Sequence, residues 1–450
     1  MEQHDNISNR SDTDNKLCHS LSSRQVGMIT IGGIIGAGLF IASASAINTI
    51  GPTILFSYMI VVLHPDSGSF SVYAEKTLGH WAGFTTGWLY WWFWMLVVAF
   101  EAIMGANILV AYFPDVHPAI FAFSILLILT LTNLFDVKKF GEFEFWFALT
   151  KVAAIVIFIV ICVSAILGYW SLNPNISGIA NLYQHGGLFP HGYGAILSGI
   201  LIVMFSFFGV EMLSIAAAEA KHPGKEIRRS TNLVIYRIAI FYVLSIFLVL
   251  CIVPWTDKGL QEMGTFQYVL HVLNVPGSKL IMDLVVFVSV SSVLNTGTYI
   301  SSRMLFSLAS RGDAPKICAN VTRAGVPRTA VIVTTIFSII CLGLNYYASE
   351  GLFFFFLSTL GAISLLIYLI IALSQLKMRK SLDKQGIQLD FKMWCFPYLT
   401  YVVIALITLT LGYMFVNEKY QYETIVTLVL AIGTVSASFI VKFIKNKSNS

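Results

Sequence analysis

Long apolar runs alternate with short polar connections along almost the whole chain of 450 residues. Eleven of these runs are long enough for a helix to cross the hydrocarbon core of a bilayer, which takes about 17 to 25 residues. They cover residues 26–47, 81–113, 119–135, 145–167, 195–218, 233–253, 280–308, 329–347, 352–376, 396–416 and 424–443. This pattern predicts an all-α protein that crosses a membrane many times.

A further run is too short for an ordinary crossing. It extends over the 12 residues from Pro52 to Leu63 and leads into His64 and Pro65 in "YMIVVLHPDSGSF". As a helix it would reach ~18 Å, whereas the hydrocarbon core is ~30 Å thick. Its length alone leaves open whether it crosses the membrane.

The basic residues favour a crossing here. If the short run counts, there are about twelve crossings, and most of the 28 Lys and Arg residues fall on one side, as the positive-inside rule expects. Their clusters occupy residues 138–139, 221–229, 303–328 and 377–392. We therefore expect a short, thinned or kinked crossing at residues 50–70, with "PDSGSF" drawn into the membrane and backbone groups near Pro65 satisfied by neighbouring helices or water.

This topology predicts a single transmembrane domain at residues 26–443 between two cytoplasmic tails, residues 1–25 and 444–450. Composition agrees with it, since 57% of residues are hydrophobic and 11% charged, against about 25% charged in soluble domains. The polar N-terminal stretch contains no apolar signal core, so we expect no cleavable signal peptide.

Nothing in the sequence predicts enzyme chemistry or a bound metal. The six cysteines are scattered without a CxxC pair, and none of the nine histidines stands at ligand spacing from them. We find no phosphate-binding loop and no nucleophile with a base beside it. We therefore expect no cofactor and no metal.

Four glycines interrupt the first membrane helix in "GGIIGAGLF", at Gly32, Gly33, Gly36 and Gly38. Each glycine in a helix interior costs about 1 kcal/mol relative to alanine, so the run favours an unwound segment that presents backbone groups to a ligand. Close helix packing is an equal alternative, because Gly32 and Gly36 have the small-xxx-small spacing.

A second break is predicted in "FSFFGVEMLSIAAAEA", where Gly209 is followed by Glu211. A carboxylate within an apolar helix is costly in lipid, so it should face a cavity or a partner. Breaks at corresponding places in two halves of a chain indicate a transporter with inverted repeats. Helices one and six would be this pair, which fits a five-plus-five repeat with two further helices.

Two other ionisable residues fall within apolar runs, Glu101 and Lys151. Such a group must face water, a counter-ion or a substrate, and a buried lysine can take up and release a proton. Lys151 is also about two turns from the predicted cytoplasmic end of its helix, so its side chain could instead reach the interface.

Aromatic and amide side chains give weaker signals. For most of the aromatic cluster in "GWLYWWFW", residues 87–94, we expect an interfacial belt or a lipid-facing surface, and for one or two of its residues a substrate-facing role. Asn295 and Thr296 lie inside another apolar run, where hydrogen bonding between helices and substrate contact are equally good interpretations.

From Ser22 to about Val441 the chain resembles amino-acid permeases of the amino acid-polyamine-organocation superfamily, and within it bacterial γ-aminobutyrate (GABA) permeases. The resemblance rests on the segments already quoted and on "GEFEFWFALTKV", "SVLNTGTYISSRMLFSLASRGDAP" and "NYYASEGLFFFFLSTLGAISLLIYLIIALSQLKMRK". "GWLYWWFW" followed by Glu101 favours the γ-aminobutyrate branch over the proline, lysine and aromatic branches.

The resemblance implies a LeuT-like fold and proton-coupled uptake of an amino acid across the bacterial cytoplasmic (inner) membrane, with no cofactor besides the proton gradient. Its partners would be the amino acid, protons and the lipid bilayer, with no nucleic acid. It implies the following site residues: Ile35, Gly36, Ala37 and Gly38 for the α-carboxylate, Phe207, Gly209 and Glu211 towards the amine, Glu101 as a residue shared with the family, and Lys151 for proton coupling. Asn295 completes the set of candidate substrate-binding residues.

The short second helix departs from the family, whose members carry a helix of ordinary length that ends in a basic residue and a Gly-Glu pair. The main hypothesis is an importer of γ-aminobutyrate or a related amino acid, with proline, aromatic or other neutral amino acids as alternative substrates. The competing hypothesis is a transport-deficient or substrate-sensing relative.

Overall fold

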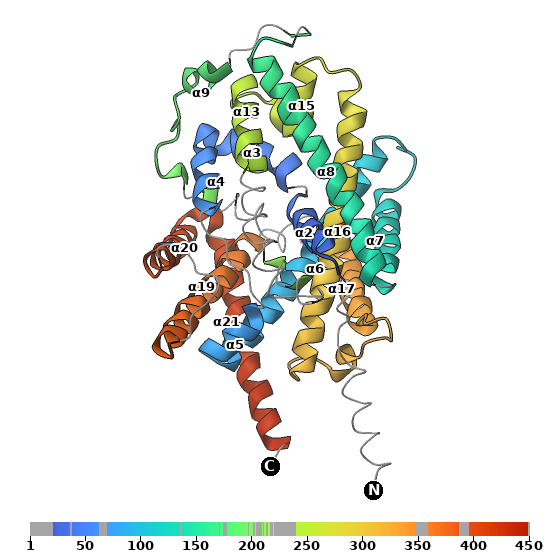
Figure 1. Ribbon diagram of the computed structural model, residues 1–450, viewed down its shortest axis with the longest axis vertical. Coiled ribbons are helices and arrows are strands. Elements are labelled where there is room, and N and C mark those ends of the chain that lie inside the picture. The colour runs from blue at the N-terminus through green and yellow to red at the C-terminus, as the bar shows by residue number, and fades with distance from the viewer. Residues whose placement is uncertain are drawn as a thin grey trace.

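The computed structural model describes residues 21–36, 38–62, 70–135, 137–170, 172–173, 178–196, 198–200, 203, 209, 211–212, 215–216, 219, 240–347, 359–386 and 396–448. The regular elements in these segments are helices, and the long ones run side by side (Figure 1). Phe207 and Ala37, two predicted site residues, lie outside the described residues, as do residues 63–69 of the short second helix.

Among the described residues, eight helical stretches are long and apolar enough to cross a membrane. They are Gly38–Met59, α6 (His80–Val110), α8 (Val137–Ile166), α16 (Ser278–Ser310), α17 (Arg328–Tyr347), α19 (Leu360–Lys384), α20 (Tyr398–Val416) and Tyr420–Lys447 within α21 (Glu418–Ser448). Two shorter apolar helices are α7 (Pro118–Leu134) and the stretch Ile240–Ile252, formed by η4 (Ile240–Leu244) and α13 (Ser245–Ile252). The predicted all-α polytopic fold class is confirmed.

The first membrane helix is divided into several pieces. Its elements are α2 (Ser23–Ile34), the π-helix η1 (Gly38–Ala42) and α3 (Ser43–Ile50), followed by η2 (Gly51–Thr53) and α4 (Ile54–Val62). Gly51 has φ +61°, and Pro52 follows it at the start of η2, so the chain turns between α3 and α4. The described part of the second membrane helix is therefore the nine residues of α4.

The remaining elements are short helices at the two ends of the molecule. At one end lie η3 (Gly178–Ala180), α9 (Asn181–Gln184), α14 (Gly259–Met263) and α15 (Thr265–Val272); at the opposite end lie α5 (Phe70–Leu78), η5 (Lys316–Ala319) and the C-terminal part of α21 (Figure 1). Between these ends, α16 packs closely along α6 and also contacts α2, α7, α8 and α17.

The outer faces of the long helices suit lipid. Large apolar side chains such as Ile128 on α7, Val160 on α8, Leu409 on α20 and Phe443 on α21 are exposed. Exposed apolar surface of this extent marks an interaction surface, and on helices long and apolar enough to span a bilayer it is suited to lipid. The chain is therefore a multi-pass membrane protein.

The aromatic cluster at the start of α6 does not form a lipid-facing belt, so that prediction was wrong for most of it. Tyr90, Trp91, Phe93 and Trp94 are all at most 5% exposed and belong to the main apolar core. The indole N–H of Trp91 donates to Thr334 Oγ1 in α17 at 3.1 Å. α6 is buried on most of its faces by surrounding helices, which periodicity within one apolar run cannot reveal.

Candidate substrate and coupling site

The glycine run of the first membrane helix contains the predicted break. α2 ends at Ile34, and Ile35 has an extended backbone with φ −84° and ψ 96°. The Ile35 N–H donates to the Ile31 carbonyl at 3.1 Å, so it completes the last turn of α2 and already has a backbone acceptor. The helix resumes as a π-helix at Gly38.

The alternative interpretation of the same glycines, close helix packing, also holds. A methyl group at Gly36 would lie 2.6 Å from Val293 Cγ2, and one at Gly32 would lie 3.2 Å from Ser292 Oγ. Both contacts are with α16, which approaches α2 along the small-xxx-small pair. The glycine run therefore serves the break and the packing together.

The second break lies against the first. Gly209 has φ +122°, a conformation that strongly favours glycine, and a methyl group there would lie 3.3 Å from the Gly33 carbonyl oxygen. Glu211 is buried, and its Oε2 accepts from the Gly209 N–H at 3.0 Å and from the Tyr368 hydroxyl of α19 at 2.9 Å. Of the two expectations for this carboxylate, a cavity or a partner, the structure shows hydrogen-bonding partners.

Lys151 reaches from α8 into the break of the first helix. Its ammonium donates to the carbonyls of Gly32 (2.5 Å) and Ile35 (2.9 Å) and to Ser292 Oγ of α16 (2.8 Å). The residue is fully buried, so the alternative that its side chain reaches the interface was wrong. An ammonium has three N–H donors, and these three acceptors match them.

The break leaves some carbonyl groups without their regular helical hydrogen bonds, and these carbonyls accept hydrogen bonds from other groups. The Ile34 carbonyl accepts from the Tyr242 hydroxyl of η4 at 3.0 Å, and the Gly36 carbonyl accepts from the Leu39 N–H at 3.2 Å. An unsatisfied carbonyl within a membrane costs several kcal/mol, so Tyr242 and Lys151 stabilise the unwound shape.

Glu144 is the main residue that sequence reasoning missed. It lies on α8 seven residues before Lys151, is fully buried, and accepts hydrogen bonds from Ser292 Oγ and, at 3.1 Å, from Asn295 Nδ2. A methyl group at Gly32 would overlap its carboxylate, so glycine leaves the space that Glu144 occupies. The spacing was a usable signal, since residues seven apart share one helix face.

Asn295 links three helices. Its amide nitrogen donates to Glu144 of α8, and its side-chain oxygen accepts from Thr132 Oγ1 (2.6 Å) and Asn133 Nδ2 (2.9 Å) of α7. Of the two interpretations left open for this amide, the structure shows hydrogen bonding between helices.

Glu101 approaches the break from α6. It is 3% exposed, and a methyl group at Gly36 would lie 3.0 Å from its Oε1. The structure thus brings Glu101, Lys151, Gly36, Gly209 and Glu211 to the two helix breaks, although sequence separates them widely.

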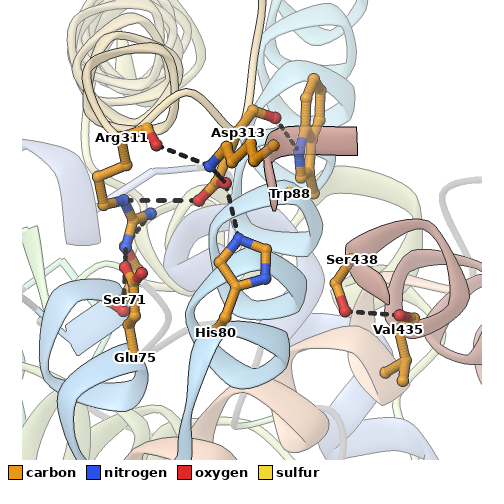
Figure 2. Close-up of polar contacts among 9 residues, drawn as sticks. Ser71, Glu75, His80, Trp88, Arg311, Asp313, Val435 and Ser438 are labelled. Atoms are coloured by element: carbon orange, nitrogen blue, oxygen red, sulfur yellow. Dashed lines mark hydrogen bonds and ion pairs between the residues drawn. The ribbon is translucent and has the colours of Figure 1, made fainter. Parts of the chain in front are cut away.

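A second group of charges lies at the end of the molecule that holds α5 and the C-terminal end of α21 (Figure 2). We call it the terminal ion cluster: Glu75, His80, Arg311, Asp313 and Lys445. Oxygen and nitrogen atoms of Glu75, His80 and Asp313 lie within 4.8 Å of one another, as metal ligands would. Arg311 (2.7 Å from Glu75) and Lys445 (2.6 Å from Asp313) neutralise both carboxylates, so the arrangement is an ion-pair network.

A buried ion pair lies between the break region and this cluster. Arg303 Nε of α16 is 2.8 Å from Glu219 Oε1, and the guanidinium lies 3.8 Å from the centre of the Tyr299 ring. The Glu219 carbonyl accepts from the Leu21 N–H at 3.1 Å, so the residue joins the start of the first helix to α16.

Comparison with known proteins identifies the family of the chain. Residues 25–447 match the family model described as "Amino acid permease", and the chain belongs to this family of transporters, which are not enzymes.

Several curated relatives are similar over nearly their whole length. The chain is 48% identical to a "Probable GABA permease" of Pseudomonas aeruginosa over 93% of the chain and 91% of the relative. It is 45% identical to a "Gamma-aminobutyric acid permease" of Escherichia coli over 95% and 94%. It is 41% identical to a protein of the same name from Bacillus subtilis over 94% and 92%.

Proposed function

We propose that the protein is a proton-coupled symporter that imports γ-aminobutyrate or a related amino acid across the bacterial cytoplasmic membrane, with both termini in the cytoplasm. The relatives' names support the substrate. The observation that carries the coupling is the buried Lys151 ammonium on the carbonyls of Gly32 and Ile35 and on Ser292.

The coupling follows from the number of donors on this side chain. A protonated lysine offers three N–H groups to its three acceptors, whereas a neutral amine offers two and carries no charge. Deprotonation therefore releases one acceptor and weakens the other bonds, because charge-assisted hydrogen bonds are about twice as strong as neutral ones. The break of the first helix is therefore held less firmly in its present shape once Lys151 loses its proton.

The substrate would lie between the two breaks. Its carboxylate would meet backbone N–H groups near Gly36, Ala37 and Gly38, next to Ile35, and its amine would lie towards Phe207, Gly209 and Glu211, with Glu101 on the side of α6. A carboxylate is favoured at the start of a resumed helix and an ammonium near a buried carboxylate.

Uptake into proteoliposomes tests the proposal. The purified protein should accumulate radiolabelled γ-aminobutyrate when the outside is more acidic, and a protonophore should abolish the accumulation. Unlabelled γ-aminobutyrate, proline, phenylalanine and lysine, added as competitors, identify the substrate class. The proposal fails if the protein binds the amino acid in detergent but accumulates none under a proton gradient.

One feature favours the second candidate, a permease relative that binds substrate without completing transport. The apolar run of the second helix has 12 residues, from Pro52 to Leu63, and would span ~18 Å as a helix, against a hydrocarbon core of ~30 Å. A variant with a second helix of ordinary length decides between the two. Uptake by that variant and none by the natural chain would establish the second candidate.

A further inference from the structure

α8 carries two buried ionisable side chains on one face, Glu144 and Lys151. Seven residues separate them, a rise of about 10 Å along the helix. The Ser292 hydroxyl of α16 lies between them and contacts both. Lys151 already has a proposed role, whereas Glu144 has none.

The hydrogen bonds run in one direction. Lys151 Nζ donates to Ser292 Oγ at 2.8 Å, and Ser292 Oγ donates to Glu144 Oε1. The other carboxylate oxygen accepts from Asn295 Nδ2 at 3.1 Å, which fixes the orientation of the carboxylate. A hydroxyl that accepts from an ammonium and donates to a carboxylate is arranged for proton relay.

We propose that Glu144 receives, through Ser292, the proton that Lys151 carries, and that it is the second proton-exchanging group of the transport cycle. This inference rests on the proton coupling proposed above. In the transfer step an N–H bond of Lys151 breaks and its proton joins Ser292 Oγ, while the hydroxyl proton moves to Glu144 Oε1. A neutral amine and a neutral carboxylic acid result, and the net charge is unchanged.

Burial makes this exchange plausible on energetic grounds. Charged groups lose their hydration inside a membrane protein, so an ammonium and a carboxylate that do not touch gain little over the neutral pair. Among the described residues packed around the pair, Glu101 of α6 is the other carboxylate that acts on Lys151. Tyr242 of η4 is the titratable neighbour of Glu101, and α7 contributes the uncharged Thr132 and Asn133 through Asn295.

The position of Glu144 fits the direction of import. It lies nearer than Lys151 to the end of α8 where Lys138 and Lys139 stand, the end that the positive-inside rule places in the cytoplasm. A relay from Lys151 to Glu144 therefore carries the proton towards the side on which an importer must release it.

The test separates substrate exchange from proton-driven accumulation in proteoliposomes. Exchange of labelled for unlabelled γ-aminobutyrate needs no net proton transfer, whereas accumulation does. A pH difference of one unit across the membrane supplies about 1.36 kcal/mol for each proton, which corresponds to a tenfold concentration ratio. A one-proton symporter therefore raises the internal substrate concentration about tenfold above the external one. We expect E144Q and S292A to lose this roughly tenfold accumulation while exchange falls by a clearly smaller factor, because exchange needs no net proton transfer.

E142Q is the matched control, with the same substitution on the same helix at an exposed residue that pairs with Arg24. It should accumulate substrate like the wild type. The inference is overturned if E144Q accumulates like the wild type, or if it loses exchange and accumulation equally, which indicates a structural role. If E144Q does not fold, the same comparison of exchange with accumulation in S292A tests the inference. If the wild type itself shows no proton-driven accumulation, the proposed function fails, and this inference fails with it.

Discussion

Replacement of Gly32 by alanine tests the packing on which the coupling site depends. The added methyl group would overlap the Glu144 carboxylate and lie 3.2 Å from Ser292 Oγ. Alanine is the better helix former by about 0.5–1 kcal/mol, so propensity alone would stabilise the protein. Overpacking costs about 1–3 kcal/mol, and each lost hydrogen bond to a charged group costs about 1.5–3 kcal/mol. With one such hydrogen bond lost, we expect a net loss of about 1.5–5.5 kcal/mol and a loss of proton-driven uptake.

Gly27→Ala is the matched control for this prediction. Gly27 lies in the same helix, and a methyl group there meets no atom within 4 Å. The control should keep uptake and unfold at the same or a slightly higher temperature. For both variants we would measure the unfolding temperature in detergent and the proton-driven uptake into proteoliposomes. Equal unfolding temperatures and equal uptake for the two variants would refute the placement of Glu144 against Gly32.

Three further substitutions probe separate contacts. Tyr242→Phe leaves the Ile34 carbonyl without its hydroxyl donor and should lower stability by about 1–3 kcal/mol in thermal unfolding; an unchanged midpoint would contradict this hydrogen bond. Arg303→Met leaves Glu219 as a buried unpaired charge and should lower the free energy of unfolding by about 3–5 kcal/mol. A second substitution, Glu219→Gln, should restore part of this stability. If the two substitutions instead destabilise the protein additively, that result would argue against the ion pair. Lys445→Met removes a partly exposed member of the terminal ion cluster and should cost under about 1 kcal/mol, so a large drop in unfolding temperature would be unexpected.

The sequence pattern predicted those features of the structure that depend on residues close together in the chain. The lengths of the apolar runs predicted a membrane protein with many crossings, and the glycine run predicted the break that the structure shows after Ile34. Lys151 was also singled out, because a charge within an apolar run is visible without a structure, but its burial was left open against a side chain that reaches the interface. These features follow from local composition and helix geometry alone.

Properties that depend on which helices meet were harder to predict. The burial of Trp94 follows from the helices around α6, and hydropathy within one run carries no information on them. Glu144 was overlooked because it stands directly before its apolar run at residues 145–167, where a charge is common. Only the approach of α16 shows that Ser292 joins it to Lys151.

The attachment of α5 sets a limit on the helix that precedes it. Arg311 holds α5 through Glu75 at 2.7 Å and through the Ser71 carbonyl at 3.3 Å, and Phe70 packs on Tyr90 of α6 at a ring distance of 4.7 Å. About eight peptide units join Val62 to Phe70, and a chain of that length extends at most about 28 Å. The end of α4 therefore cannot lie farther than that from Phe70, so the attachment of α5 bounds the amplitude of any movement of α4.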